Sequence, residues 1–234
     1  MYKLKRVAVL QSNYLPWKGY FDIIHDVDMF IFYDDVQYTK NDWRNRNRIK
    51  TRNGEQWLTI PVGSGKGLNI DQIDLTQHEW QKRHWRSILQ GYAHAPYFDR
   101  YVEFFEELYL GRILPNLSEL NQFIIRAVSA KFLGMNVLFE RSNTYTVLGQ
   151  RQERLLNLLQ QVGATDYVSG PSGRAYIDDS EFVKRGINLR YKSYDNYPAY
   201  RQQSNPFNHC VSIVDLLFMT GEDAPSYIWG WRNV

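Results

Sequence analysis

The stretch that decides the fold runs from Val7-Ala-Val-Leu10 through the polar loop Gln11-Ser-Asn-Tyr-Leu-Pro-Trp-Lys18 and residues 19–27 to Met29-Phe-Ile-Phe-Tyr33. Short apolar runs such as residues 7–10 and 29–33 are typical of buried parallel strands. Residues 19–27 place apolar side chains on one face of a helix, so the pattern predicts a strand, a helix and a second strand. Because the crossover of such a unit is right-handed, we expect both strands to end at one edge of a parallel sheet, where open α/β sheets bind ligands.

The rest of the chain alternates between strand and helix patterns at its end and is helical in its middle. Residues 57–62 and 68–74 resemble two strands joined by Gly63-Ser-Gly-Lys-Gly67, which predicts a hairpin. We predict helices at 79–92, 98–110, 117–133, 150–161 and 211–219, and strands at 136–139, 166–169 and 187–191. The expected architecture is a single α/β domain of doubly wound type over residues 1–234, with a β-hairpin and a mainly helical insert at residues 79–134.

The composition describes a globular protein with a mild positive charge. The 234 residues are 44% hydrophobic, and the net charge is +3 with a pI near 8.8, a field too weak to indicate nucleic acid by itself. No run approaches the roughly 18 apolar residues of a membrane span, so we expect no span and a cytoplasmic location. The one cysteine, Cys210, excludes internal disulfides, and we expect it to be a buried thiol at the start of a helix. The histidines follow no metal-ligand spacing, so we assign no metal-binding residues to them.

The loop after the first predicted strand is the first candidate binding segment. It precedes a helix, whose free N–H groups and positive end favour an anion. Its amides Gln11 and Asn13 and the cation Lys18 are candidates to hold phosphate, and Tyr14 is counted with them. The alternative is a polar loop in which Pro16 and Trp17 only pack against the start of the helix.

Two carboxylates, Asp34 and Asp35, follow the second predicted strand. Paired carboxylates at a strand end are able to bind Mg²⁺ through oxygen or to act as a catalytic base. Capping and ion pairing with nearby arginines is the alternative.

The segment from residue 38 to residue 52 is polar and basic, and we expect it to form a functional loop. Arginines alternating with asparagines supply paired donors for phosphate or carboxylate. The candidate binding residues are Tyr38, Arg44, Asn45, Arg46 and Arg48. A solvated basic face is one alternative, and RNA binding with Trp43 and Tyr38 as stacking groups is another.

Two further features carry candidate residues. The turn Ser169-Gly-Pro-Ser-Gly-Arg-Ala-Tyr176 follows a predicted strand at the same sheet edge, and Ser169, Gly170, Arg174 and Tyr176 are its candidate binding residues. His84 lies on a predicted helix and is a candidate catalytic proton donor or phosphate contact, with a buried, satisfied histidine as the alternative.

Several of these blocks together resemble the WbqC-like protein family. They are residues 11–22, 34–38, 42–50 and 57–62, the turn at Ser169-Gly-Pro171, and residues 212–218 with Gly221. Ser12 stands where the family usually has proline. The resemblance implies a role in bacterial surface-polysaccharide (O-antigen) biosynthesis, where the family has been suggested to include glycine transferases.

The first strand, loop and helix are also similar to the nucleotidylyltransferase-like superfamily, which implies a Rossmann-like sheet. That superfamily carries a histidine-containing HxGH-type motif at the first helix, and this chain has Lys18-Gly-Tyr20 there, without a histidine.

The function that we expect is an aminoacyl- or glycyl-transferase that binds a small anionic or sugar-nucleotide substrate at the sheet edge. Gln11, Asn13 and Lys18 would hold phosphate, and Arg44, Arg46 and Arg48 would close over it. The cofactor stays open, with a nucleotide and Mg²⁺ as the candidate. The alternative is a non-catalytic RNA- or protein-binding module that uses residues 38–52. The aromatic content also permits a homodimer.

Overall fold

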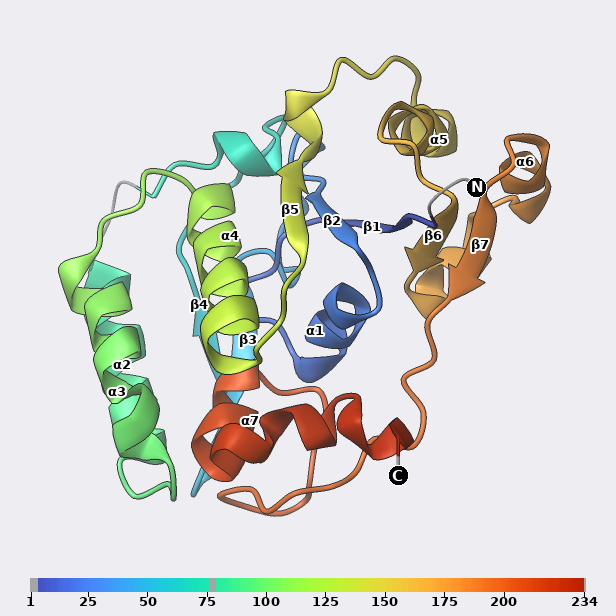
Figure 1. Cartoon of the computed structure of the whole chain (residues 1–234). Helices are drawn as coiled ribbons and strands as arrows, with labels where there is room; N and C mark the ends of the chain where they lie inside the picture. The colour runs from blue at the N-terminus through green and yellow to red at the C-terminus, as the bar shows by residue number, and fades with distance from the viewer. Residues whose placement is uncertain (1–3, 76–78, 234) are drawn as a thin grey trace.

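A five-stranded parallel sheet forms the centre of the computed structural model, which describes residues 4–75 and 79–233. Its strands are β1 (Arg6–Leu10), β2 (Met29–Phe32), β5 (Leu138–Arg141), β6 (Asp166–Ser169) and β7 (Asn188–Tyr191), in the order β5-β2-β1-β6-β7 (Figure 1). The chain adds strands on one side of β1 and then on the other, so the order reverses between β1 and β6. The expected Rossmann-like α/β sheet is therefore confirmed.

The predicted strand, helix and strand unit at the start of the chain is confirmed as β1, α1 (Lys18–His25) and β2, with β1 parallel to β2 and Val7 opposite Met29. Alternate residues of these strands enter two different cores. Ala8 and Phe30 face the core shared with α1, whereas Val9 and Ile31 face the core shared with α5 (Arg151–Gln161) and α6 (Asp179–Lys184). Burial on both faces explains why the strands are continuous apolar runs.

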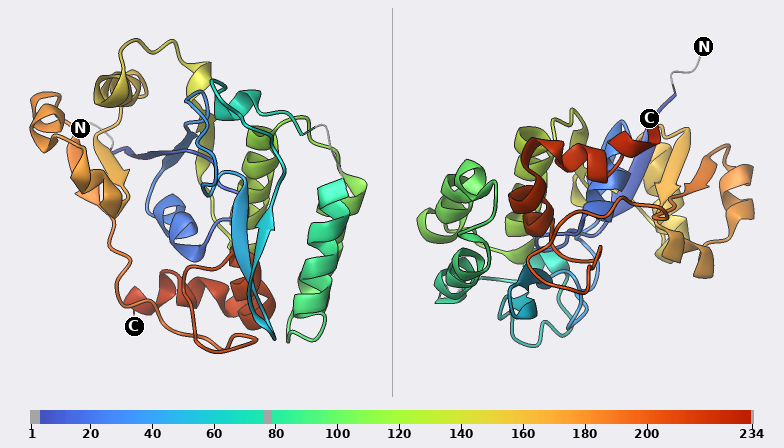
Figure 2. Two further views of the ribbon diagram at one scale, coloured as in Figure 1. Left: turned by 180° about the vertical axis from the view of Figure 1, so that it is seen from behind. Right: turned by 90° about the horizontal axis from the view of Figure 1, so that it is seen from below.

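Helices cover both faces of the sheet. Figures 1 and 2 show α5 and α6 beside β6 and β7, and the other helices around α1 and β5. The predicted helical residues between 79 and 133 form α2 (Glu79–Tyr92), α3 (Phe98–Glu106) and α4 (Leu117–Ala127), with π-helical continuations η2 (Glu107–Gly111) and η3 (Val128–Phe132). The predicted last helix is α7 (Ile213–Thr220). Short 3-10 helices occupy Ile70–Gln72, Ser142–Thr144, Pro171–Ala175, Gly221–Tyr227 and Gly230–Asn233.

The hairpin lies at different residues from those predicted. It pairs β3 (Arg46–Thr51) with β4 (Gly54–Thr59), so the expectations of strands at 68–74 and of a loop throughout 38–52 were wrong. The cause is alternation: Asn47 and Ile49 of β3 are buried, whereas Arg46 and Arg48 lie on the outer face. The buried Asn47 is polar and Lys50 is buried as well, so β3 lacks the apolar alternation that marks a half-buried strand in a sequence. Gly54 begins β4 after the hairpin turn and has a φ of +105°, a backbone conformation that residues other than glycine rarely adopt.

Two expectations from composition have different outcomes. Over residues 4–75 and 79–233, no helix is both long and apolar enough to cross a membrane. The expectation that Cys210 is buried was wrong, because its side chain is exposed. The reason is that α7 begins only at Ile213, and Cys210 lies in the preceding loop, one residue before the buried side chains begin at Val211.

Candidate functional site

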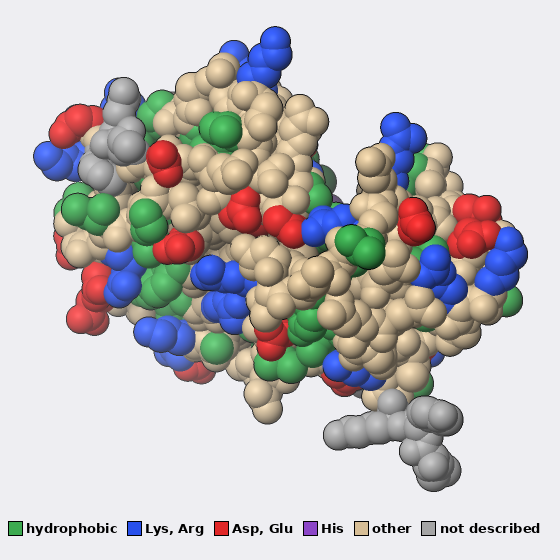
Figure 3. Space-filling view, turned by 90° about the horizontal axis from the view of Figure 1, so that it is seen from above, with side chains coloured by type: hydrophobic (Ala, Val, Ile, Leu, Met, Phe, Trp, Pro, Cys, Tyr) green, Lys and Arg blue, Asp and Glu red, His purple; other side chains and the backbone are tan. Residues whose placement is uncertain are grey.

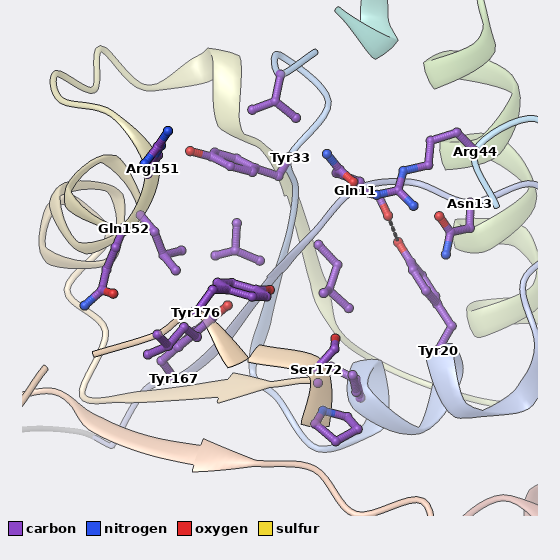
Figure 4. A pocket seen from close by; sticks show the side chains of 18 of the residues that line it. Gln11, Asn13, Tyr20, Tyr33, Arg44, Arg151, Gln152, Tyr167, Ser172 and Tyr176 are labelled. Carbon is purple, nitrogen blue, oxygen red and sulfur yellow. Dashed lines mark hydrogen bonds between the residues drawn. The ribbon is translucent and has the colours of Figure 1, made fainter. Parts of the chain in front are cut away.

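A cavity of about 1040 Å³ opens at the carboxyl edge of the sheet, where the strand order reverses between β1 and β6. Its walls come from the segments that follow β1, β2 and β6 and from the first turn of α5 (Figure 4). Figure 3 looks down on this end of the molecule and shows a notch with acidic and basic side chains at its border. This is the position where open α/β sheets bind their ligands.

The loop between β1 and α1 forms one wall, and many contacts fix its backbone. The Ser12 N–H donates to Asp34 Oδ1 at 2.8 Å, and Asn47 Nδ2 donates to the Leu15 carbonyl at 2.7 Å. The Tyr14 N–H donates to the carbonyl of Trp43 at 2.9 Å. Leu15 has a φ of +43°, a strained value for a branched side chain, which persists only where surrounding contacts impose it. These contacts hold Gln11 and Asn13 at the cavity.

The polar end of the cavity consists of Gln11, Asn13 and Arg44 (Figure 4). Arg44 pairs with Asp42 at 3.0 Å, and its Nε and the Oδ1 of Asn13 are buried without a hydrogen-bond partner among the described residues. Tyr20 donates to the Gln11 carbonyl at 3.0 Å, and burial holds the pKa of Tyr20 well above its ordinary value, so its hydroxyl stays protonated. Buried polar groups without protein partners are unusual in native proteins, and these two are able to form hydrogen bonds to a ligand in the cavity.

The opposite end of the cavity, which we call the tyrosine end, consists of Tyr33, Tyr167 and Tyr176 (Figure 4). Leu155 and Ile177 also line the cavity. The first turn of α5 borders this end through Arg151, Gln152 and Arg154. The side chain of Gln150 at the start of α5 makes no capping hydrogen bond.

Asp34 and Asp35 do not line this cavity. Asp34 is buried and accepts hydrogen bonds from the Ser12 N–H, from Ser118 at 2.5 Å and from Gln122 at 2.9 Å. Asp35 accepts hydrogen bonds from Ser142 and Arg154. Both carboxylates instead line a neighbouring cavity of about 220 Å³. Asp34 therefore fixes the backbone of the β1–α1 loop through the Ser12 N–H.

Tyr14 and His84 lie together, away from the cavity. Tyr14 Oη and His84 Nδ1 are 2.8 Å apart, and His84 Nε2 is 3.2 Å from the Thr59 carbonyl. Burial lowers the pKa of His84 to about 4, so the ring is neutral at pH 7. Because a carbonyl only accepts, Nε2 carries the proton and Tyr14 donates to Nδ1. This arrangement matches the alternative of a buried, satisfied histidine.

Lys18 also lies outside the cavity. It begins α1, and its buried side chain extends to the Pro198 carbonyl at 3.3 Å and to within 4.7 Å of the Tyr197 ring centre. Burial lowers the pKa of Lys18 to about 8. The structure therefore does not bring this cation to Gln11 and Asn13.

The remaining candidates divide between the cavity and other places. Gly170 and Tyr176 line it, but Ser169 is buried beneath Gly173, and the exposed Arg174 lies over the Tyr191 ring at 4.2 Å. The other candidates lie in or beside the hairpin: Tyr38 and Asn45 are buried, and Arg46 and Arg48 lie over Trp57 on the outer face, 4.6 and 5.2 Å from its ring centre.

The sequence interpretation missed several cavity residues. Tyr33 directly follows β2, so the rule that strand ends share one edge was enough to identify it. Arg151, Gln152 and Arg154 begin a helix that was predicted, but no local signal tells which helix start packs beside which loop.

One group of described residues has potential metal ligands within 4.8 Å of one another: Asp22, His25 and Asp26. Lys192 lies 2.9 Å from Asp22, and Arg232 also pairs with Asp22. These cations already neutralise the carboxylate, so the group is an ion-pair network.

Two comparisons with known proteins identify the family of the chain. The sequence model of the WbqC-like protein family matches residues 11–227, which include the cavity residues from Gln11 to Tyr194. Rv1507c, an uncharacterized protein of Mycobacterium tuberculosis (strain ATCC 25618 / H37Rv), is 44% identical over 228 residues, which cover 96% of this chain and 98% of the relative. No solved structure matches the chain. The chain belongs to the WbqC-like protein family.

Proposed function

We propose that the protein is a cytoplasmic transferase of surface-polysaccharide biosynthesis, which binds a nucleotide or another anionic donor in the cavity between β1 and β6. The observation that carries the proposal is Arg44: it lines the cavity at the strand-order reversal and keeps a buried Nε without a partner among the described residues. Membership of the WbqC-like family supports the polysaccharide context, through the association of this family with O-antigen biosynthesis. Transfer of a glycyl or aminoacyl group to a sugar is the reaction that we favour.

The cavity suits a transfer reaction in size and charge. A volume of about 1040 Å³ is at the upper end of ligand cavities, which leaves room for a donor and an acceptor. In the proposed reaction, an acceptor hydroxyl or amine forms a bond to the acyl carbon and releases its proton to water, while the bond from that carbon to the leaving group breaks and the leaving group departs with the electron pair. Arg44 would stabilise the negative charge of that leaving group, and Asp34 would act indirectly by holding the loop that carries Gln11 and Asn13.

Binding of nucleotides to matched arginine variants tests the proposal. Titration calorimetry with ATP, a UDP-sugar and a CMP-sugar, with and without Mg²⁺, is expected to find a ligand that saturates one site per chain. Arg44→Ala should weaken that binding roughly tenfold or more, because a charge-assisted hydrogen bond is lost. Arg174→Ala is the matched control, since Arg174 is exposed and outside the cavity, and it should bind as the wild type does. Equal affinities of the two variants would refute the proposed site.

A second candidate function is RNA binding, and the exposed indoles of the hairpin favour it. Trp43 and Trp57 are 40% and 45% exposed and stack with ring centres 5.8 Å apart, beside Arg46 and Arg48. Aromatic rings among cations are able to stack on single-stranded bases. The salt dependence of affinity for a short RNA separates the two functions: RNA binding should weaken steeply as salt rises, while a nucleotide in the cavity should show a shallower slope.

A further inference from the structure

The two ends of the large cavity differ in chemistry, which restricts how a ligand can lie in it. Figure 4 shows Gln11, Asn13 and Arg44 on one side, and Tyr33, Tyr167 and Tyr176 on the other. A ligand that satisfies both ends carries anionic or strongly polar groups at one end and a planar, largely apolar group at the other.

The polar end is the stronger anion site. The side chain of Arg44 is only 17% exposed, so water and salt screen its charge weakly. The tyrosine end also has a cation nearby, Arg151, but that side chain is exposed and its charge is well screened. Arg154 at that end pairs with Asp35, just as Arg44 pairs with Asp42, but of these two arginines only Arg44 keeps a buried Nε without a partner among the described residues. An anionic group therefore gains most beside Arg44.

The tyrosine end is suited to a flat ring. The Tyr167 ring is buried and stacks on Phe182, with ring centres 5.5 Å apart, which fixes its position. The guanidinium of Arg154 lies 4.9 Å from the ring centre of Tyr33. Tyr176 lines the cavity and is 74% exposed, whereas Tyr33 is half-buried and Tyr167 is buried. A planar ligand that covers Tyr176 would remove this aromatic surface from water.

We propose that the cavity binds a nucleoside diphosphate in one orientation, with the base against Tyr176 at the tyrosine end and the phosphates at Arg44. This inference rests on the proposed function and adds the position of each half of the ligand. It makes Tyr176 a residue that recognises the base and Arg44 a residue that recognises the phosphates. The first turn of α5 would then lie beside the base and not beside the phosphates.

Calorimetric titration of the full chain with ADP, UDP and inorganic pyrophosphate tests this orientation. At least one of the two nucleotides should bind the wild type, and Tyr176→Ala should weaken that binding about tenfold, the size expected for loss of one base–aromatic stack. The same variant should leave the affinity for pyrophosphate unchanged. Tyr176→Phe, which keeps the ring, should bind all probes like the wild type. Arg44→Ala should weaken nucleotide and pyrophosphate by similar factors.

The outcomes separate this inference from the proposed function. If a nucleotide binds the wild type but Tyr176→Ala changes nothing, or weakens pyrophosphate equally, the orientation is wrong and nucleotide binding stands. Failure of pyrophosphate to bind the wild type would overturn the orientation in the same way. If neither ADP nor UDP binds, while ATP or a nucleotide sugar does, the diphosphate assignment alone is wrong. If no nucleotide binds, this inference fails together with the nucleotide form of the proposed function. Because Tyr176 is so exposed, its replacement should not unfold the protein, which circular dichroism checks.

Discussion

Residues 11–18 and residues 38–52 are two polar stretches that the structure uses in very different ways. The first contributes two of its polar side chains, Gln11 and Asn13, to the large cavity. The second is longer and more basic, yet it contributes only Arg44, because most of it forms the hairpin strand β3 and the turn before it. Polar composition therefore indicates possible ligand contacts, but the backbone decides which side chains reach the ligand.

The backbone reason differs between the two stretches. The first leaves the end of a central parallel strand, so it must start at the ligand-binding edge. In the second, the turn at residues 42–45 directs Arg44 to the cavity, and β3 then places Arg46 and Arg48 on the outer face of the hairpin. A buried carboxylate also anchors each stretch. Asp34 accepts a hydrogen bond from the Ser12 N–H of the first stretch. Asp215 acts on the second through Tyr92, which donates to Asp215 and accepts from the Lys50 N–H.

The largest effect is expected when the anchor of the first stretch is removed. Asp34→Ala would leave two buried donors without an acceptor, the Ser12 N–H and Ser118 Oγ, and it would also remove one of the two acceptors of Gln122 Nε2, which still donates to Ser118 Oγ at 2.8 Å. Each unsatisfied group costs about 1–3 kcal/mol, so the free energy of unfolding should fall by about 3 kcal/mol or more. Urea denaturation measures this value. Asp35→Ala is the comparison, since Asp35 holds one buried donor, Ser142 Oγ, together with the partly exposed Arg154, and its smaller loss should be about 1–2 kcal/mol. Equal losses would show that Asp34 has no special role.

The two stretches are also expected to respond to pH in opposite directions. Asp215, which accepts a hydrogen bond from Tyr92, has its pKa raised to about 6 by burial. Protonation of Asp215 is therefore easier in the folded protein, so its contribution to stability is lost as the pH rises through about 6. Tyr92 in turn binds the Lys50 N–H of β3, which links this effect to the second stretch.

His84, which binds Tyr14 of the first stretch, has the opposite slope. Its pKa is lowered to about 4 by burial, so its contribution to stability is present above its ordinary pKa of 6.5 and is lost as the pH falls toward about 4. Between about pH 4 and 6 the two groups should nearly cancel in the wild type. In Asp215→Asn the stability should rise with pH over this interval, and in His84→Gln it should fall, each by up to about 1.4 kcal/mol per pH unit. Urea midpoints across this range give the slopes, and parallel profiles for the two variants would contradict the expectation.

The same comparison explains how much of the molecule was predictable from its sequence. The pattern of residues 7–33 predicted the parallel unit and its ligand-binding edge, because apolar runs and helical spacing are local signals. The position of Gln11 and Asn13 at the cavity followed from the location of that edge. Lys18 did not, because it is the first residue of α1 and its side chain extends toward the Pro198 carbonyl.

The other differences arise from contacts between distant segments. Arg151 and Gln152 reach the cavity because α5 packs near β2, although more than a hundred residues separate them in the sequence. The hairpin was predicted at the wrong residues because Asn47, which faces inward from β3, is polar, so the strand lacks a clear apolar alternation. Asp34 was interpreted as a catalytic candidate because its position at the strand end is chemically suitable, and only the structure shows that three donors occupy it.

The smallest effect is expected on the outer face of the hairpin, where Arg46→Ala tests the difference between neighbouring arginines. Arg46 lies over the Trp57 ring at 4.6 Å and outside the cavity, so its removal should change the free energy of unfolding by no more than about 1 kcal/mol. Nucleotide affinity should stay within about twofold of the wild type, well inside the tenfold loss expected for a direct ionic contact. Calorimetry with the nucleotide that binds best, and urea denaturation, give both numbers. A loss of affinity as large as that of Arg44→Ala would mean that this arginine leaves the hairpin face when a ligand binds, and the contrast between the two stretches would then hold only for the ligand-free protein.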